Sequence, residues 1–153
     1  MNKEQKNNLW AGTAFIIVSL LQVFLLFSSL VDKSVTIDEF AHLPAGVNVL
    51  SSGDFRYCAL NPPLMNVLSA LPVRAMDIKP PPPRYLPEAQ RHSFWANAYV
   101  FMEYHRHNYH RLFIVARLMT VGIVVLLGLL IFAWARMLVP ERRNTAAVLS
   151  VVL

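Results

Sequence analysis

The strongest constraint on this chain is an uninterrupted run of uncharged residues at positions 9–31. At about 1.5 Å per helical residue, such a run is long enough to cross a hydrocarbon core of roughly 30 Å. It is also longer than the apolar core of a signal peptide, and no small-x-small cleavage site follows it. Residues 9–31 are therefore predicted to form a retained transmembrane helix.

A second apolar segment covers residues 112–139. Its centre carries no charge and is bounded by Arg117 and Arg136, with Trp134 near the second boundary, where interfacial aromatics are common. Residues 140–144 form a polar turn, after which residues 145–153 are apolar again but too few to cross a bilayer. We expect a second transmembrane helix over 112–139 and a third that starts at 145, so that the chain ends inside a span.

The composition agrees with a membrane protein. Hydrophobic residues make up 56% of the chain and charged residues 15%, whereas charged residues are about a quarter of an ordinary soluble domain. The net charge of +5 is spread over several segments, so no nucleic-acid partner is expected. Cys58 is the only cysteine, which excludes a disulfide within the chain. The predicted fold class is all-α, with polytopic transmembrane helices.

The distribution of basic residues predicts the orientation. Lysines precede the first span within residues 1–8, and arginines follow the second within residues 136–143. Short segments rich in Lys and Arg stay on the cytoplasmic side, whereas long loops are translocated largely regardless of charge. The loop at 32–111 is therefore expected to face outward. The chain is predicted to be a multi-pass protein of the cell (inner) membrane with its amino end in the cytoplasm.

The outer loop is too long to be structureless, and its first part predicts an amphipathic helix. Phe40, Leu43, Val47 and Leu50 recur at helical spacing, and the Ser-Ser-Gly sequence at 51–53 provides a stop.

A second surface helix is predicted to start at the Asn-Pro-Pro sequence of residues 61–63. Asn61 suits the N-cap, and Pro is tolerated at the first helical position. The apolar stripe consists of Leu64, Val67, Leu68 and Leu71, and the helix is expected to end near Pro72. Both helices are expected to rest on the bilayer surface or on the spans.

The rest of the loop divides into a spacer and an aromatic element. The four prolines at 80–83 predict extended polyproline-like chain. Residues 93–109 are crowded with aromatic side chains that suit the headgroup region, and they are expected to lead into the second span. His105, His107 and His110 have a spacing that could hold zinc, but neighbouring arginines oppose a bound cation, which favours ordinary interfacial histidines.

Three motifs follow the first span in order: Thr-Ile-Asp-Glu-Phe-Ala-His at residues 36–42, Ser-Gly-Asp-Phe at 52–55 and Asn-Pro-Pro-Leu at 61–64. Their order and spacing resemble the first outer loop of the GT-C membrane glycosyltransferases, which include protein O-mannosyltransferases and aminoarabinose transferases. Members of this group take sugars from polyprenyl phosphates. The resemblance covers nearly the whole chain, although family members are several times longer, so this segment alone is not expected to be active.

The resemblance implies a set of site residues. Asp38 and Glu39 are the catalytic candidates, and Arg117 stands where such proteins often carry an arginine that meets the carrier phosphate. The substrate-binding candidates are Arg117, Asn61, His42 and Asp54. Asn61 occupies a position where family members commonly have lysine or histidine, so a cationic phosphate contact is not expected there. Asp54 is first a turn residue and second a ligand.

The chemistry of such a donor requires one carboxylate. The polyprenyl phosphate leaves as a stabilised anion, whereas the acceptor hydroxyl or amine must lose a proton as it attacks. Asp38 is predicted to be that base, with His42 one helical turn away as an orienting residue. Thr36 and Glu39 also fit a capping box, which accounts for Glu39 better than for Asp38.

Two functions therefore stay open. The first is the amino-terminal part of an inverting glycosyltransferase that uses a polyprenyl-phosphate-linked sugar, with membrane lipids around it and an unassigned acceptor (protein, lipid or glycan). The second is a non-enzymatic small membrane protein whose outer loop binds a partner or scaffolds a complex. The residues assign no cofactor and no metal ligand, and they leave open whether a divalent metal assists.

Overall fold

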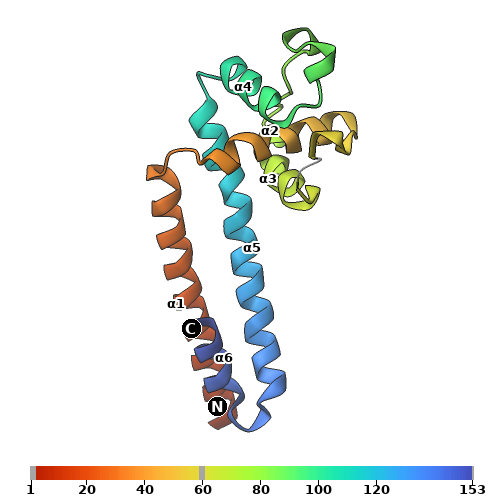
Figure 1. Ribbon diagram of the computed structural model, residues 1–153. Coiled ribbons are helices and arrows are strands. Elements are labelled where there is room, and N and C mark those ends of the chain that lie inside the picture. Colours follow the sequence, from red (N-terminus) through yellow and green to blue (C-terminus); the bar gives the residue numbers. More distant parts are fainter. Residues whose placement is uncertain (1–2, 59–60, 153) are drawn as a thin grey trace. The chain divides into compact units, whose positions relative to one another are not determined.

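The computed structural model describes residues 3–58 and 61–152, and the described chain is all-helical, without a β-strand in these two ranges (Figure 1). It divides into two compact units. Unit 1 consists of residues 1–31 and 121–153, and unit 2 consists of residues 32–120. The long helix α5 (Tyr109–Leu138) contributes its first turns to unit 2 and the remainder to unit 1.

Unit 1 is built from α1 (Lys3–Asp32), the larger part of α5 and the short helix α6 (Arg143–Val152), which follows the single turn η4 (Pro140–Arg142). The rings of Phe15 and Phe132 pack with centroids 4.7 Å apart, which brings α1 against α5. Gln22 donates a hydrogen bond from its side-chain amide to the carbonyl of Val151 at 3.4 Å. α6 therefore packs beside α1, and Leu153 lies outside the described residues.

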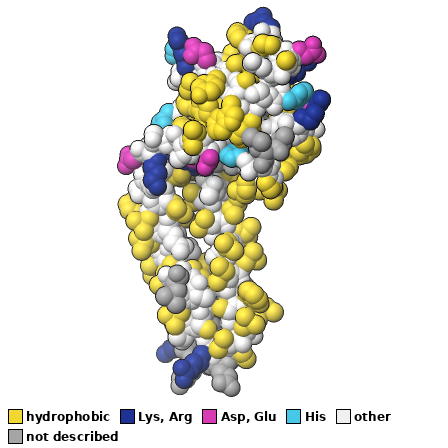
Figure 2. Space-filling view, in the orientation of Figure 1, with side chains coloured by type: hydrophobic (Ala, Val, Ile, Leu, Met, Phe, Trp, Pro, Cys, Tyr) yellow, Lys and Arg dark blue, Asp and Glu magenta, His cyan; other side chains and the backbone are white. Residues whose placement is uncertain are grey.

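Two helical segments, Asn8–Asp32 and Tyr109–Leu138, are long and apolar enough to cross a membrane. Only 6% of the residues in the most apolar window of each are buried, whereas the core helix of a soluble protein is mostly buried. Hydrophobic side chains are spread along the visible face of unit 1, and Lys and Arg gather near its lower end (Figure 2). Exposed apolar surface of this extent marks a membrane or protein interaction site.

Unit 2 is a small helical domain. It contains α2 (Ile37–Ser52), α3 (Pro63–Ala75), α4 (Phe94–Tyr104) and the start of α5, with single turns η1 (Phe55–Cys58), η2 (Pro83–Tyr85) and η3 (Glu88–Gln90) between them. Its main core consists of Leu43, Val47, Ala70, Val73, Phe101, Leu112, Phe113 and Ala116. Burial of these side chains holds α2, α3, α4 and the first turns of α5 together.

The ends of α2 confirm two local predictions. The Thr36 side chain accepts a hydrogen bond from the Glu39 backbone at 3.4 Å, and the Glu39 carboxylate accepts one from the Thr36 backbone at 3.0 Å. This reciprocal capping box is the one that the sequence predicts. At the other end Gly53 adopts a φ of 70°, the left-handed conformation in which glycine is favoured, and terminates the helix.

Other boundaries differ from the sequence predictions. Asn61 is not the N-cap of α3, because Pro62 occupies that position and makes no side-chain capping bond. Pro72 does not end α3, which continues to Ala75. The aromatic element ends at Tyr104 rather than 109, and a turn at residues 105–108 separates it from α5. The four prolines are extended only up to Pro82, because Pro83 begins η2.

The predicted apolar stripes divide between the core and the surface. Leu43 and Val47 of α2 are buried in the cluster that includes the first turns of α5. Leu64 and Leu71 of α3 are exposed, at 66% and 42% of their surface. The expected contact of these α3 side chains with a bilayer stays a prediction.

Gly46 is the point of closest approach between α2 and α3. A Cβ atom at this position would lie 2.0 Å from the carbonyl oxygen of Asn66 and 2.9 Å from the Cβ of Ala70. A backbone oxygen cannot move aside in the way that a flexible side chain does, so α3 itself would have to shift.

We therefore expect Gly46→Ala to destabilise unit 2 by about 1–3 kcal/mol, the usual cost of overpacking a core. Denaturant unfolding followed by circular dichroism measures this change. Gly12→Ala is the matched control, because no atom lies within 4 Å of a Cβ added there. Equal stability of the Gly46→Ala and Gly12→Ala proteins would contradict the close packing of α2 on α3.

Candidate functional site

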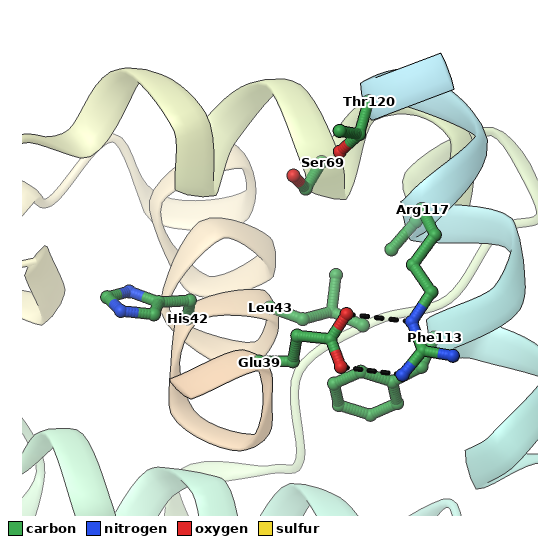
Figure 3. A pocket seen from close by; sticks show the side chains of 8 residues that line it. Glu39, His42, Leu43, Ser69, Phe113, Arg117 and Thr120 are labelled. Atoms are coloured by element: carbon green, nitrogen blue, oxygen red, sulfur yellow. Dashed lines mark hydrogen bonds and ion pairs between the residues drawn. The ribbon is translucent and has the colours of Figure 1, made fainter. Parts of the chain in front are cut away.

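Glu39 and Arg117 form a two-pronged ion pair between the first turn of α2 and the first part of α5 (Figure 3). Arg117 donates from Nε to Oε1 of Glu39 at 2.7 Å and from Nη2 to Oε2 at 2.6 Å. The arginine side chain is 10% exposed and the glutamate side chain 32%. Such parallel charge-assisted bonds are among the strongest in proteins and fix the geometry of both groups.

Arg117 also holds the segment that precedes α2. Its Nη1 donates to the carbonyl of Lys33 at 3.0 Å, and its Nη2 donates to the carbonyl of Ser34 at 2.9 Å. A guanidinium has five N–H groups, so most of its donors are used within unit 2. The resemblance predicts that Arg117 meets a carrier phosphate, whereas in the structure Arg117 binds Glu39 and two backbone carbonyls. A phosphate contact stays a prediction.

The ion pair controls the ionisation of Glu39. Its hydrogen bonds with Arg117 hold the pKa of the Glu39 carboxyl below its ordinary value of 4.5, against the opposing effect of partial burial. A carboxyl whose pKa is lowered by folding contributes stability above its unfolded pKa, and this contribution is lost as the pH falls through the folded pKa.

We therefore expect unit 2 to lose stability below about pH 4.5 and to keep it between about pH 5 and 7. Thermal unfolding between pH 3 and 7 measures the change. In Glu39→Gln the contribution of this carboxyl disappears, so the melting temperature should fall less steeply between about pH 5 and pH 3 than it does in the unchanged protein. An identical acid slope in the two proteins would show that the Glu39–Arg117 pair does not contribute to it.

Asp38 differs from Glu39 in its exposure and in its partners. It lies in the first turn of α2 and is exposed. Within the described part of the chain its carboxylate makes no hydrogen bond or ion pair. The adjacent acids of the Asp-Glu motif are thus separated into one carboxylate that is held by an arginine and one that is open to solvent and to a ligand.

A small pocket lies beside the ion pair. It has a volume of about 110 Å³, and it is lined by Glu39, His42, Leu43, Ser69, Phe113, Ala116, Arg117 and Thr120 (Figure 3). The pocket therefore has room for several water molecules next to the ion pair.

The pocket brings together some of the predicted site residues and adds others. Glu39, His42 and Arg117 line it, whereas Asp38, Asp54 and Asn61 do not. Phe113, Ala116 and Thr120 were not predicted. Together with Arg117 they recur at the i, i+3, i+4, i+7 spacing of one helix face, a signal that was present in the sequence.

His42 does not orient Asp38 by any hydrogen bond among the described residues. Its Nδ1 is buried and has no hydrogen-bond partner in that part of the chain. The imidazole ring instead packs edge-on against Phe94 of α4, with centroids 5.2 Å apart. His42 therefore links α2 to α4 and presents an unsatisfied ring nitrogen.

Asp54 is a structural turn residue. Its carboxylate accepts hydrogen bonds from the Arg56 side chain at 2.7–3.0 Å and lies 3.0 Å from Nε2 of His92. The bonds from Arg56 hold the pKa of the Asp54 carboxyl well below its usual range. Asn61 is exposed in the turn before α3. Neither residue lies beside the Glu39–Arg117 pair in the pocket.

His105, His107 and His110 do not lie together on one face of a helix. His107 lies in the turn between α4 and α5, and both it and His110 are exposed. Over residues 3–58 and 61–152, no three His, Cys, Asp or Glu side chains converge in a way that could hold a metal ion. Burial lowers the pKa of His105, whose Nε2 lies 3.0 Å from the carbonyl of Lys79.

Comparison with protein-family models, with curated proteins and with solved structures finds no significant match. The site must therefore be judged on its own geometry: an exposed carboxylate on the first turn of a helix, next to a glutamate–arginine pair that holds the chain leading into that helix.

Proposed function

We propose that this chain is the amino-terminal part of an inverting glycosyltransferase that takes a sugar from a polyprenyl phosphate. The acceptor is a hydroxyl or amine on the outer side of the membrane. The two apolar helices span the membrane, and unit 2 lies at the outer surface as the start of the catalytic domain. The mechanism is that of GT-C enzymes, which the motifs at residues 36–42, 52–55 and 61–64 resemble.

The observation that supports this proposal best is the division of roles between Asp38 and Glu39. Asp38 is exposed and has no partner among the described residues, which a general base needs in order to reach an acceptor. Glu39 is fixed by Arg117, and the same arginine binds the carbonyls of Lys33 and Ser34. Asp38 therefore lies in a helical turn that Arg117 fixes twice, through Glu39 after it and through the Lys33 and Ser34 carbonyls before it.

The proposed reaction has one chemical step. The acceptor oxygen or nitrogen gives its proton to Asp38 and forms a bond with the anomeric carbon of the donor sugar. The bond between that carbon and the phosphate oxygen breaks, and the polyprenyl phosphate leaves with the electron pair. Because a phosphate is a stable leaving group, no general acid is needed, and attack from the opposite face inverts the anomeric centre.

Arg117 acts here as a positioning residue. It holds the first turn of α2, and through it Asp38, at a constant place relative to α5 within unit 2. Positioning of this kind contributes to catalysis because a displacement of about 1 Å in a reacting group can cost a hundredfold in rate.

The proposal requires unit 2 to face away from the cytoplasm, because nucleotide sugars stay inside and lipid-linked donors are used outside. Glu88, exposed in η3, is a suitable place for a reporter cysteine. We expect Glu88→Cys, in a Cys58→Ser background, to react with an impermeant thiol reagent in intact cells. The matched control is Arg142→Cys, which should react only after the cells are broken. The reverse pattern would overturn the orientation and with it the reason for a lipid-linked donor.

The proposed function itself is tested by incubating membranes that contain the full-length protein with a labelled polyprenyl-phosphate sugar and measuring release of the polyprenyl phosphate. Donor-dependent release supports the transferase. A correctly inserted protein that releases nothing with any acceptor would favour the alternative, a non-enzymatic membrane protein whose loop binds a partner.

A further inference from the structure

A second pocket in unit 2 lies away from the Glu39–Arg117 pair and shares no lining residue with the first one. It has a volume of about 240 Å³. One wall is the proline run at residues 80–83, and the polar lining consists of Asn48, Ser51, Ser52, Tyr57, Arg91 and Asn97. The pocket therefore joins the second half of α2 to the beginning of α4.

Arg91 is the charged group of this pocket. Over the described ranges its guanidinium makes no ion pair, and its Nε is buried without a hydrogen-bond partner. A buried donor without an acceptor is unfavourable, so an oxygen atom that met it would stabilise the protein. The planar guanidinium fork matches the two oxygens of a carboxylate or a phosphate.

The backbone of Arg91 is held in place at both of its polar groups. Its N–H donates to the carbonyl of Glu88 at 3.2 Å, and its carbonyl accepts from the Asn97 side chain at 2.7 Å. Asp54, two residues after the lining residue Ser52, is paired with Arg56 and His92. The backbone of Arg91 is thus fixed, and no carboxylate of the described residues pairs with its guanidinium.

The remaining lining suits a ligand with several hydroxyl groups. The Ser51 hydroxyl donates to the carbonyl of Val47 at 2.8 Å, and the Ser52 hydroxyl donates to the carbonyl of Asn48 at 2.8 Å. The Ser52 oxygen also accepts from the Asp54 backbone N–H at 3.2 Å, which leaves it one lone pair, whereas the Ser51 oxygen can accept from two O–H groups of a ligand. The opposite wall of prolines offers no N–H donor and presents apolar ring faces, on which the C–H face of a sugar ring can pack.

The size of the pocket limits the ligand. Sites for drug-sized molecules occupy roughly 300–1,000 Å³, so 240 Å³ is suited to a single ring. We propose that this pocket binds one sugar unit that carries a carboxylate or phosphate group, with Arg91 on the anionic group and the serine oxygens on the hydroxyls. The inference goes beyond the transferase reaction, because it concerns a separate site that can bind whether or not the chain takes part in catalysis.

Saturation-transfer NMR on the purified chain in detergent micelles tests this site. The probes are glucuronate for a carboxylate, glucose 1-phosphate for a phosphate, and glucose and acetate for the ring and the anion alone. We expect saturation-transfer signals from the ring protons of glucuronate or glucose 1-phosphate that are stronger than those from the ring protons of glucose or the methyl protons of acetate. Arg91→Met should weaken binding about ten- to a hundredfold, the effect of a lost charge-assisted bond.

The matched control is Arg84→Met, because Arg84 is exposed, lies over the ring of Tyr85 and does not line the pocket. It should bind the probes as the unchanged chain does. If Arg91→Met does not fold, Arg91→Lys keeps the charge and should weaken binding severalfold by losing the fork. The proposal would be overturned if neither glucuronate nor glucose 1-phosphate binds. It would also be overturned if the Arg91→Met protein binds the anionic sugars as well as the unchanged chain does, or if glucose binds as well as they do.

Discussion

Asp38→Asn should lower sugar transfer by about a hundred- to ten-thousandfold in the full-length protein while leaving donor binding nearly unchanged. Asparagine keeps the shape of the side chain and removes the base, so the loss belongs to the transfer step rather than to the ground-state complex. Because Asp38 is exposed and has no partner among the described residues, the substitution should not disturb the fold.

The control for this substitution is Asp77→Asn. Asp77 is another exposed aspartate of unit 2, with a φ of 59° that asparagine also tolerates. Among the described residues its carboxylate pairs with Arg74 and Lys79. This variant should transfer sugar at the normal rate. Expression and membrane insertion are measured for both variants, and full activity of a normally inserted Asp38→Asn protein would rule out the proposed mechanism.

Arg117→Ala should lower the free energy of unfolding of unit 2 by about 3 kcal/mol, at the lower end of the range for breaking a buried ion pair because Glu39 is partly exposed. The change leaves the Glu39 carboxylate and the carbonyls of Lys33 and Ser34 without this donor. Denaturant unfolding of the protein in detergent measures it. Turnover should fall as well, because Asp38 loses its fixed position.

A double-mutant cycle with Glu39→Gln separates the ion pair from the carbonyl contacts. We expect a coupling energy of about 1–3 kcal/mol between the two positions, as for other residues in direct contact. Arg111→Ala serves as the control, because Arg111 is an exposed arginine of the same helix. A coupling energy near zero would mean that the two side chains do not stabilise each other. Normal stability of the Arg117→Ala protein would mean that Arg117 only anchors α5 at the membrane interface.

The ends of α2 could be predicted from the sequence, because capping and helix termination depend on residues that are close together in the chain. The capping box of Thr36 and Glu39 and the glycine stop at Gly53 depend on neighbouring residues, and both are present. The long apolar helices follow from length and composition alone. The prediction that α3 ends near Pro72 was wrong, because the helix is held in the core by Ala70 and Val73 and tolerates a proline near its last turn.

The contacts between distant residues were not predictable in the same way. Glu39 and Arg117 are 78 positions apart, and nothing in their local sequence indicates that they meet. The role of Gly46 depends on the approach of the Asn66 carbonyl from another helix. Likewise, the pairing of Asp54 with His92 and the position of Arg91 beside the proline run arise only when the loop folds back on α2.

The donor class can be decided by a single transfer measurement on membranes that contain the full-length protein. The same labelled sugar is supplied either on a polyprenyl phosphate or on a nucleotide, and product formation is compared with that of membranes containing Asp38→Asn. We predict transfer from the polyprenyl phosphate alone, and a loss of at least about a hundredfold in the variant. Transfer from the nucleotide sugar, or equal transfer by the two proteins, would contradict the proposed function.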